Sequence, residues 1–187
     1  LQVGGKEMKL MFASDIHGSA YYCEKMLECY RREQAERLWI LGDILYHGPR
    51  NDLPKEYAPK KVIVMLNEIK EEICAVRGNC DTEVDQMVLE FPILADYSLL
   101  SVDGLRLYAT HGHVYNEQHM LPLMPGDILI HGHTHIYEAK KSGEHVILNP
   151  GSVSIPKGDN PPTYAILEDG VFSIKDLDGQ VLKEIEL

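Results

Sequence analysis

The segment His131-Gly132-His133-Thr134-His135 (HGHTH) carries the main indication of the fold, because it directly follows a short apolar strand predicted over Asp127 to His131. Imidazole is a frequent ligand of divalent metal ions. Three histidines within five residues at a strand end are compatible with metal binding, but on its own the segment leaves an ordinary loop equally open. The rest of the chain decides between the two.

Four other segments rich in metal-ligand side chains also stand where a predicted strand ends. They are Asp15-x-His17 after Lys9 to Ser14, Gly42-Asp43 after Leu38 to Leu41, Gly78-Asn79 after Ile73 to Val76, and His111-Gly112-His113 after Leu105 to Thr110. Each is weak alone, since Asp, Asn and Gly are common turn residues. The carboxyl ends of strands in an open α/β sheet line one crevice. We therefore expect all five segments to converge on one site.

The first half of the chain alternates strands with helices predicted over Ser19 to Ala35 and Lys60 to Lys70, which favours parallel βαβ units. Tyr46 to Pro59 contains three prolines and a glycine and is predicted to be a long loop. Further short strands are predicted at His145 to Leu148, Tyr164 to Leu167 and Val171 to Ile174. We expect one mixed α/β domain over residues 8–187, preceded by an N-terminal extension or cloning remnant (residues 1–7).

Composition limits the classes of function. The 187 residues include 18 basic and 29 acidic side chains, a formal net charge of -11, so we expect no nucleic-acid partner. No apolar segment approaches the roughly 18 residues of a membrane span, and we expect no membrane association and a cytoplasmic location. The four cysteines form no C-x-x-C pair, which argues for free thiols and against a structural zinc site.

The residue types suit a pair of divalent ions. Carboxylate, imidazole and amide oxygen are ligands for Mn, Fe, Zn or Ni. Residues at positions i and i+2 of an extended segment point the same way, so Asp15 with His17, and His133 with His135, are each expected to face one cavity. An aspartate can bridge two cations through its two oxygens, and Asp43 is our candidate for that bridge.

The ordered set S-D-I-H-G, L-G-D, R-G-N-C-D, T-H-G-H, G-H-T-H and N-P-G-S resembles the calcineurin-like metallophosphoesterase superfamily, and within it the small YfcE-type phosphodiesterases. The resemblance extends from Met8 to beyond Ser154. It implies a four-layer α/β/β/α sandwich of two mixed sheets with two metal ions at its edge, manganese first, with zinc, iron or nickel as alternatives. One ion would be held by Asp15, His17 and His135, the other by Asn79, His111 and His133, and Asp43 would be shared.

Several assignments stay open at this point. Either His111 or His113 can be the ligand, and the family pattern favours His111; His131 matches no ligand position. Many relatives follow the metal-binding Asn with His, where this chain has Cys80. The thiol either affects which esters are cleaved or is a small residue without catalytic consequence, and we take Asn79 and Cys80 as the candidate catalytic residues.

Two arginines are candidate substrate contacts. Arg77 can approach the phosphoryl group, although an ion pair with Asp81 or Asp85 is the simpler interpretation. Arg50 and His47 stand in the proline-rich loop. Either can contact substrate, but exposure to solvent is the simpler interpretation. Asn149-Pro150-Gly151-Ser152 is predicted to form a tight turn that supports the site.

Together these features predict a phosphodiesterase in which a hydroxide bridging two metal ions attacks in line. Weak phosphomonoesterase activity is expected because Cys80 lacks the positive charge of a histidine. The partner would be a small phosphodiester, and a homo-oligomer is possible. The alternative from another class is a non-catalytic interaction scaffold similar to a eukaryotic retromer subunit. A nuclease is disfavoured by the absence of a basic stripe.

Overall fold

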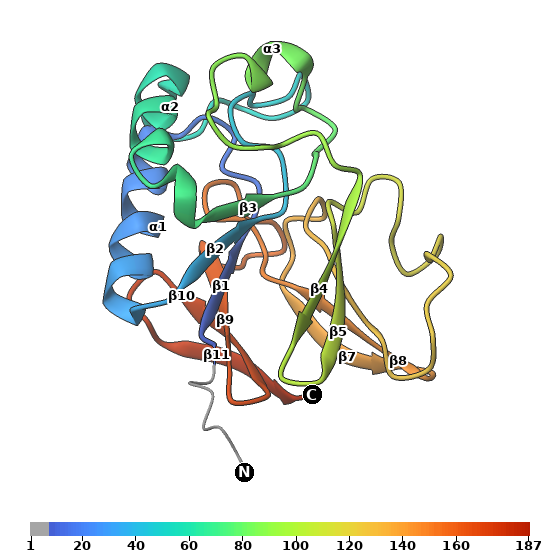
Figure 1. Ribbon diagram of the computed structural model, residues 1–187. Coiled ribbons are helices and arrows are strands. Elements are labelled where there is room, and N and C mark those ends of the chain that lie inside the picture. The colour runs from blue at the N-terminus through green and yellow to red at the C-terminus, as the bar shows by residue number, and fades with distance from the viewer. Residues whose placement is uncertain (1–7) are drawn as a thin grey trace.

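Two mixed β-sheets pack face to face in the computed structural model, which describes residues 8–187 (Figure 1). The first sheet has the order β11-β10-β9-β1-β2-β3 and the second the order β4-β5-β6-β8-β7. The predicted extension, residues 1–7, lies outside the described residues. The strands are β1 (Leu10–Ala13), β2 (Arg37–Ile40), β3 (Ile73–Ala75), β4 (Tyr97–Val102), β5 (Leu105–Thr110), β6 (Ile128–Ile130), β7 (Glu138–Ser142), β8 (His145–Asn149), β9 (Thr163–Glu168), β10 (Val171–Asp176) and β11 (Val181–Glu186).

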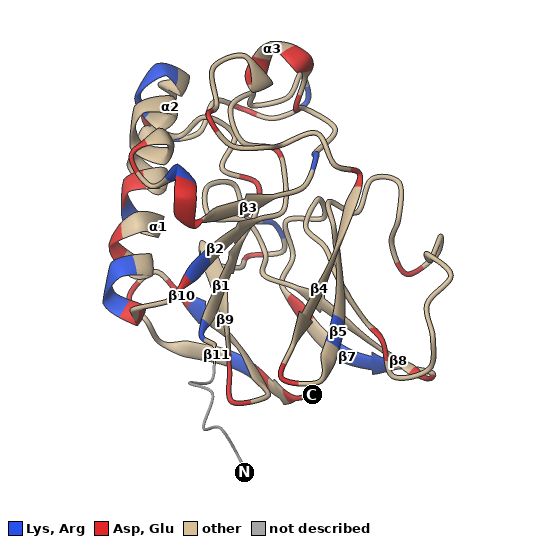
Figure 2. Cartoon of the chain, in the orientation of Figure 1, with Lys and Arg blue, Asp and Glu red and all other residues tan. Residues whose placement is uncertain are grey.

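The helices lie on the outer face of the first sheet and above its carboxyl-terminal edge (Figure 1). They are α1 (Ala20–Glu33), α2 (Pro59–Asn67), the short α3 (Glu83–Gln86) and a 3-10 turn at Lys70–Glu72. Helix α1 begins at Ser19, whose hydroxyl accepts a hydrogen bond from the Tyr22 amide, and it ends at Gln34 in a left-handed conformation. Acidic and basic residues are intermixed along α1, whereas the charged residues of α2 are basic (Figure 2).

Strand β1 is apolar throughout because both of its faces are buried. Met11 and Ala13 belong to the core between the first sheet and the helices, whereas Leu10 and Phe12 belong to the core between the two sheets. The second core also contains Trp39, Phe172 and side chains from β5, β6 and β8. β1 is therefore fixed between two packed layers, which fixes the position of the residues that follow it.

The parallel pairings bring five strand ends to one edge of the sandwich. β1, β2 and β3 pair in parallel in the first sheet, as do β5, β6 and β8 in the second. Each predicted ligand segment follows one of β1, β2, β3, β5 and β6. The convergence expected from the sequence therefore has its origin in the strand directions.

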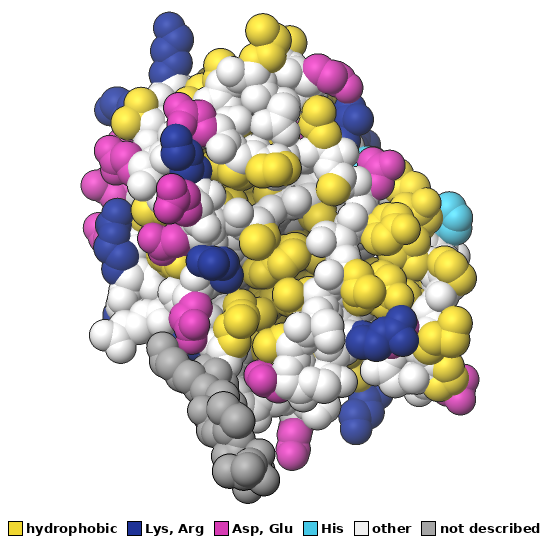
Figure 3. Space-filling view, in the orientation of Figure 1, with side chains coloured by type: hydrophobic (Ala, Val, Ile, Leu, Met, Phe, Trp, Pro, Cys, Tyr) yellow, Lys and Arg dark blue, Asp and Glu magenta, His cyan; other side chains and the backbone are white. Residues whose placement is uncertain are grey.

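Three strands, β4, β7 and β11, were not predicted from the sequence. All three are edge strands, and β4 and β11 alternate exposed with partly buried residues. Tyr97 and Leu99 of β4 are about half exposed, and apolar side chains are visible over this part of the surface (Figure 3). β7 reads Glu-Ala-Lys-Lys-Ser, a polar composition that carries almost no strand signal.

The predicted α/β fold with two packed mixed sheets is confirmed. The outer face of the second sheet is covered by coil instead of helices. Residues 87–187, all of them described, contain no helix. On that side the chain between β5 and β6, residues 111–127, runs as irregular coil (Figure 1). Pro122, Pro125 and Gly126 disfavour a helix there, and the burial of Leu121 shows that the coil still packs on the molecule. None of the helices in residues 8–187 has the length and hydropathy to cross a membrane.

Candidate metal centre

The predicted ligand side chains from both sheets meet at the strand ends. Asp15, His17 and His135 form one group of possible ligand atoms that all lie within 4.8 Å of one another, and Asp43, His111 and His133 form a second. The two groups are joined by short contacts: Asp43 Oδ2 lies 3.3 Å from His111 Nε2 and 3.6 Å from His17 Nε2. Asp43 thus stands between the two groups.

The structure also shows where Asn79, His111 and His113 lie relative to the two ligand groups. Asn79 Oδ1 lies 3.1 Å from His111 Nε2, so the amide oxygen faces the second group. The ring of His111 is fully buried in the cluster, whereas His113 is exposed and belongs to neither group. His131 is buried behind the cluster, where its Nδ1 lies 3.0 Å from the Gly132 carbonyl. This geometry favours His111 over His113.

Five of the predicted ligands have left-handed backbone conformations. Their φ angles lie between 49° and 67°, at Asp15, His17, Asp43, His133 and His135. Asp15 and His17 do share one ligand group, and His133 and His135 do line one pocket, but the extended backbone assumed for these pairs was wrong. The chain instead turns sharply as it leaves each strand. Non-glycine residues rarely adopt this conformation, and a concentration of them at one place is typical of a functional site.

Three histidines direct a ring nitrogen into the cluster because the other nitrogen is used by the backbone. Nδ1 of His17 contacts the Tyr46 carbonyl at 2.8 Å, Nδ1 of His111 the Leu41 carbonyl at 2.6 Å, and Nδ1 of His135 the Ile155 carbonyl at 2.7 Å. A carbonyl oxygen only accepts, so each Nδ1 carries the proton and donates it. Nε2 of each ring faces the cluster, which is how metal-binding histidines are usually oriented.

Asp15 supplies the test of whether a cation fits. Its Oδ2 accepts hydrogen bonds from the Ser14 hydroxyl at 2.7 Å and the His133 amide at 3.0 Å. Its Oδ1 is buried without a hydrogen-bond donor, although His135 Nε2 lies 3.1 Å away. A buried carboxylate oxygen without a donor is costly. A divalent cation between this oxygen and the neighbouring imidazole nitrogens would satisfy all of them, so the residues present fit a metal.

The charges in the cluster depend on one another. Burial alone would raise the pKa of Asp15, but the charge of His111 and the nearby imidazoles of His135 and His17 hold it well below its usual value. Burial alone would lower the pKa of His111, yet Asp15 and Asp43 raise it to about 9. The His111 proton thus offsets two buried carboxylates in the protein alone. Metal binding to such a site is expected to release this proton.

Asp81 positions the loops that carry Asp43 and Asn79, a role that the sequence did not reveal. Its buried carboxylate accepts hydrogen bonds from the amides of Asp43 at 2.8 Å, Ile44 at 2.9 Å and Gly78 at 2.7 Å. The two loops can approach so closely only because residue 78 is glycine: a Cβ there would lie 2.1 Å from Asp43 Oδ1.

Arg77 does not use the carboxylate of Asp81. Its Nε donates to the Asp81 backbone carbonyl at 3.2 Å, and its Nη2 lies 3.7 Å from Glu83 Oε1. Asp85, the other predicted partner, instead accepts from Thr82 at the start of α3. An ion pair is present as expected, but with Glu83, and this geometry favours a structural role for Arg77 over contact with substrate.

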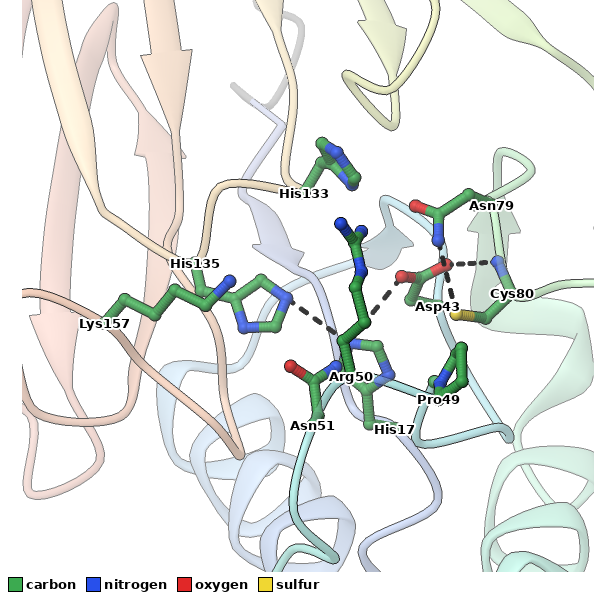
Figure 4. Close-up of a pocket in the computed structure, with 11 residues that line it drawn as sticks. His17, Asp43, Pro49, Arg50, Asn51, Asn79, Cys80, His133, His135 and Lys157 are labelled. Atoms are coloured by element: carbon green, nitrogen blue, oxygen red, sulfur yellow. Dashed lines mark hydrogen bonds and ion pairs between the residues drawn. The ribbon is translucent and has the colours of Figure 1, made fainter.

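A pocket of about 310 Å³ opens onto the cluster. Besides cluster residues it is lined by Gly48, Pro49, Arg50, Asn51, Cys80 and Lys157 (Figure 4). Arg50 therefore stands where a substrate contact was expected. Lys157 and Asn51 were not identified from the sequence, because neither belongs to a motif. Lys157 is held near the site by a hydrogen bond from its amide to the His135 carbonyl at 3.0 Å.

Cys80 lines this pocket and is 8% exposed. Its amide donates to Asp43 Oδ1 at 2.8 Å, and Asn79 Nδ2 lies 3.3 Å from its sulfur. Burial and the charge of Asp43 raise the pKa of the Cys80 thiol to about 12, so the thiol is neutral at physiological pH. A neutral thiol is neither a strong nucleophile nor a cation.

The turn at residues 149–152 supports the site as predicted. Asn149 Nδ2 donates to the Gly132 carbonyl at 3.0 Å, and the Ser152 hydroxyl donates to the Asp15 carbonyl at 2.9 Å. The Ser154 hydroxyl donates to the same carbonyl, also at 2.9 Å. These bonds hold Asp15 in its left-handed conformation.

Comparison with known proteins agrees with this geometry. Residues 8–169 match the family model of the calcineurin-like phosphoesterase superfamily domain. The chain belongs to this superfamily. Membership implies that the protein is a phosphoesterase and that its cluster binds divalent metal ions.

One relative and two solved structures illustrate the range of similarity. The chain is 51% identical to the phosphodiesterase YfcE of Escherichia coli K12 over 173 residues, 92% of this chain and 94% of the relative. A solved structure of Escherichia coli YfcE covers 96% of this chain and 99% of its own, with a TM-score of 0.94 and 49% identity. Vps29 of Entamoeba histolytica in complex with zinc covers 96% and 99%, with a TM-score of 0.64 and 22% identity; this likeness concerns the fold alone.

Proposed function

We propose that the protein is a phosphodiesterase that uses two divalent cations, manganese first, and acts weakly on phosphomonoesters. The observation that carries this proposal is the pair of ligand groups on either side of Asp43, with the Asp15 Oδ1 atom left without a hydrogen-bond donor. The similarity to a relative named as a phosphodiesterase, over nearly the whole of both chains, supports the same substrate class.

Asp15, His17 and His135 would hold one cation, and Asn79, His111 and His133 the other, with Asp43 between them. When bound, two such cations supply the positive charge that activates water and clamps the phosphoryl oxygens for an in-line displacement. The proposed ligands are oxygen and imidazole donors, which suits manganese. We further propose that residues 8–187 act as a single domain.

One arginine and one lysine side chain can offset the negative charge of the substrate. Arg50 and Lys157 line the pocket, and neither has an ion-pair partner among residues 8–187. In a chain with a net charge of -11, unpaired cations beside a metal centre are notable. We propose that they attract and orient the phosphoryl oxygens.

The decisive experiment is hydrolysis of bis(4-nitrophenyl) phosphate by the metal-stripped protein supplied in turn with Mn, Zn, Fe or Ni. We expect hydrolysis that depends on added metal and is highest with Mn. An absence of hydrolysis with every metal would contradict the proposal and favour the scaffold alternative, which predicts tight binding of a protein partner without turnover.

Weak phosphomonoesterase activity follows from the neutral side chain at position 80. A monoester dianion gains more from an added positive donor than a diester monoanion does. Cys80→His is therefore expected to raise kcat/KM for 4-nitrophenyl phosphate relative to bis(4-nitrophenyl) phosphate, by a few-fold. Cys80→Ser serves as the matched neutral control. An unchanged ratio in a folded Cys80→His variant would count against this part of the proposal.

A further inference from the structure

A second depression adjoins the metal-centre pocket, and Cys80 lines both. This depression, the apolar groove, has a volume of about 360 Å³. Its walls include Tyr46, Tyr57, Ile63, Val84 and Val88, from the proline-rich loop, α2 and the α3 region. None of these residues belongs to a sequence motif, and none is needed to hold the two metal ions.

The groove keeps apolar side chains in contact with water. Val84 is 69% exposed, Val88 42% and Tyr46 42%. Exposed apolar side chains are ordinary when scattered, but a group of them that forms one depression beside an active site is typical of a ligand-binding surface. Apolar side chains are indeed visible on the surface beside α3 (Figure 3).

The two ends of the site therefore differ in character. Lys157 and Cys80 lie at opposite sides of the metal-centre pocket, with Arg50 in front of the cluster (Figure 4). The Lys157 side carries positive charge, whereas the Cys80 side leads into the apolar groove. A phosphodiester has one arm on each side of its phosphorus atom, so a bound diester can reach both ends.

The wall of the groove is tied directly to the metal centre. The Tyr46 carbonyl accepts the hydrogen bond that orients His17, at 2.8 Å. The His47 ring packs between Tyr46 and Tyr57, with ring centroids 4.8 and 5.1 Å apart. Asn51 Nδ2 donates to the His47 carbonyl at 2.8 Å. The groove is thus built before substrate arrives, which lowers the entropic cost of binding.

We propose that the apolar groove binds one ester arm of the substrate, and that this arm is aromatic or otherwise apolar. The inference rests on the proposed phosphodiesterase function and adds the substrate class. It also gives Cys80 a role: the small, neutral side chain leaves open the passage between the metal centre and the groove. An imidazole at this position would narrow that passage.

The test is the direct binding of benzylphosphonate and methylphosphonate to the Mn-loaded protein, measured by titration calorimetry. The two probes share the phosphonate group and differ in the apolar arm. We expect the wild-type protein to bind benzylphosphonate at least about tenfold more tightly, as the burial of an aromatic ring allows. The variants are Val88→Glu and Val88→Lys. Val181→Glu, at a β11 position that is 45% exposed and far from the groove, is the matched control.

Both Val88 variants are expected to reduce the preference to about threefold or less, and Val181→Glu is expected to keep it. Two variants of opposite charge are needed because a charge effect alone would weaken both probes with Glu and strengthen both with Lys, leaving the ratio unchanged. Thermal unfolding shows that each variant is folded. Equal binding of the two probes by the wild-type protein, binding of neither, or a ratio that survives both substitutions would overturn the inference.

The outcomes separate this inference from the proposed function. Metal-dependent hydrolysis of bis(4-nitrophenyl) phosphate without a preference for benzylphosphonate would leave the phosphodiesterase proposal standing and overturn the groove. A preference that Val88 substitutions remove, in a protein that hydrolyses no diester, would support the groove as a binding site and overturn the proposed function.

Discussion

The metal-centre cluster contains buried carboxylates and the cluster around Glu33 a partly buried one, and their partners differ. Glu33 connects α1 to β9, β10 and the start of β1: its carboxylate accepts from the Tyr164 hydroxyl at 2.6 Å and from Lys175 at 2.9 and 3.0 Å, and Lys9 lies 3.5 Å away. Asp15 and Asp43 have no lysine or arginine within ion-pair distance in residues 8–187. Their neighbours are imidazoles.

The difference separates a structural carboxylate from a ligand. Each Glu33 oxygen has a donor, and the two lysines balance its charge, so nothing further is needed there. Asp15 keeps one buried oxygen without a donor, next to nitrogens that also point inward. Burying such an oxygen is unfavourable unless a cation completes the site. The oxygen without a donor therefore indicates which cluster binds a ligand.

The largest effect is expected for Asp43→Asn, which removes the charge that both metal ions would share. The amide keeps an Oδ1 acceptor for the Cys80 amide, so the fold should be retained. We expect kcat/KM for bis(4-nitrophenyl) phosphate with Mn to fall by at least about a hundredfold, since even indirect partners of metal ligands cost 10 to 100-fold. Glu33→Gln should leave kcat/KM unchanged. A folded Asp43→Asn variant whose kcat/KM lies within tenfold of the wild-type value would contradict the distinction between the two clusters.

Metal-dependent stability is the next largest effect. At a concentration of about 100 times its Kd, a ligand of the folded state adds about 2.7 kcal/mol to the free energy of unfolding. For a domain of this size that corresponds to a rise in Tm of about 5 to 10 °C. We expect this rise with Mn in the wild-type protein and in Glu33→Gln, and a much smaller one in Asp43→Asn. A rise of equal size in all three, measured by calorimetry, would mean that the ions bind elsewhere.

The interior of the fold could be predicted from the sequence because its signals are local. β1, β2, β3 and the helix α1 are marked by apolar segments and helical periodicity, and their parallel order follows from the alternation of strand and helix. β4, β7 and β11 are edge strands, whose pairing on one side only leaves a weak apolar signal. The resemblance implied a helical layer on the second sheet. Residues 111–127 form coil there instead, because Pro122 and Pro125 disfavour a helix.

The site could be predicted as far as its motifs extend. The seven ligand-type residues are identified by residue type at strand ends, and the structure brings them together. Asp81 was missed as a positioning residue because its role depends on amides from two different loops. Lys157 was missed because an isolated lysine carries no local signal. The left-handed backbone at Asp15 has no sequence signal either, because the hydrogen bonds that hold it come from Ser152 and Ser154, which are distant in the chain.

A smaller effect, on the free energy of unfolding, is expected for Glu33→Gln, which tests the cluster around Glu33. The amide of Gln cannot form an ion pair with Lys175, although its oxygen can still accept the hydrogen bond from the Tyr164 hydroxyl. Because hydrogen bonds to charged groups contribute more than neutral ones, we expect the free energy of unfolding to fall by about 1 to 2 kcal/mol. Urea denaturation of the metal-free protein at pH 7 measures it. An equally stable variant would mean that the cluster contributes no net stability.

The pH dependence of this difference is the smallest effect and the most specific. Burial alone would raise the pKa of Glu33, but hydrogen bonds from Tyr164 and Lys175 and the charge of Lys175 hold it below its ordinary value of 4.5. A lowered pKa in the folded state means that the ionised carboxylate adds stability above the pKa of the unfolded chain, and that this contribution is lost as the pH falls through the folded value. The stability of the wild-type protein and of Glu33→Gln should therefore converge as the pH falls below about 4.5. Taking the difference between the two proteins at each pH cancels the titration of Asp15 and Asp43, which both retain. A difference that stays constant from pH 7 to pH 3 would show that the Glu33 charge contributes nothing and that packing alone accounts for the effect.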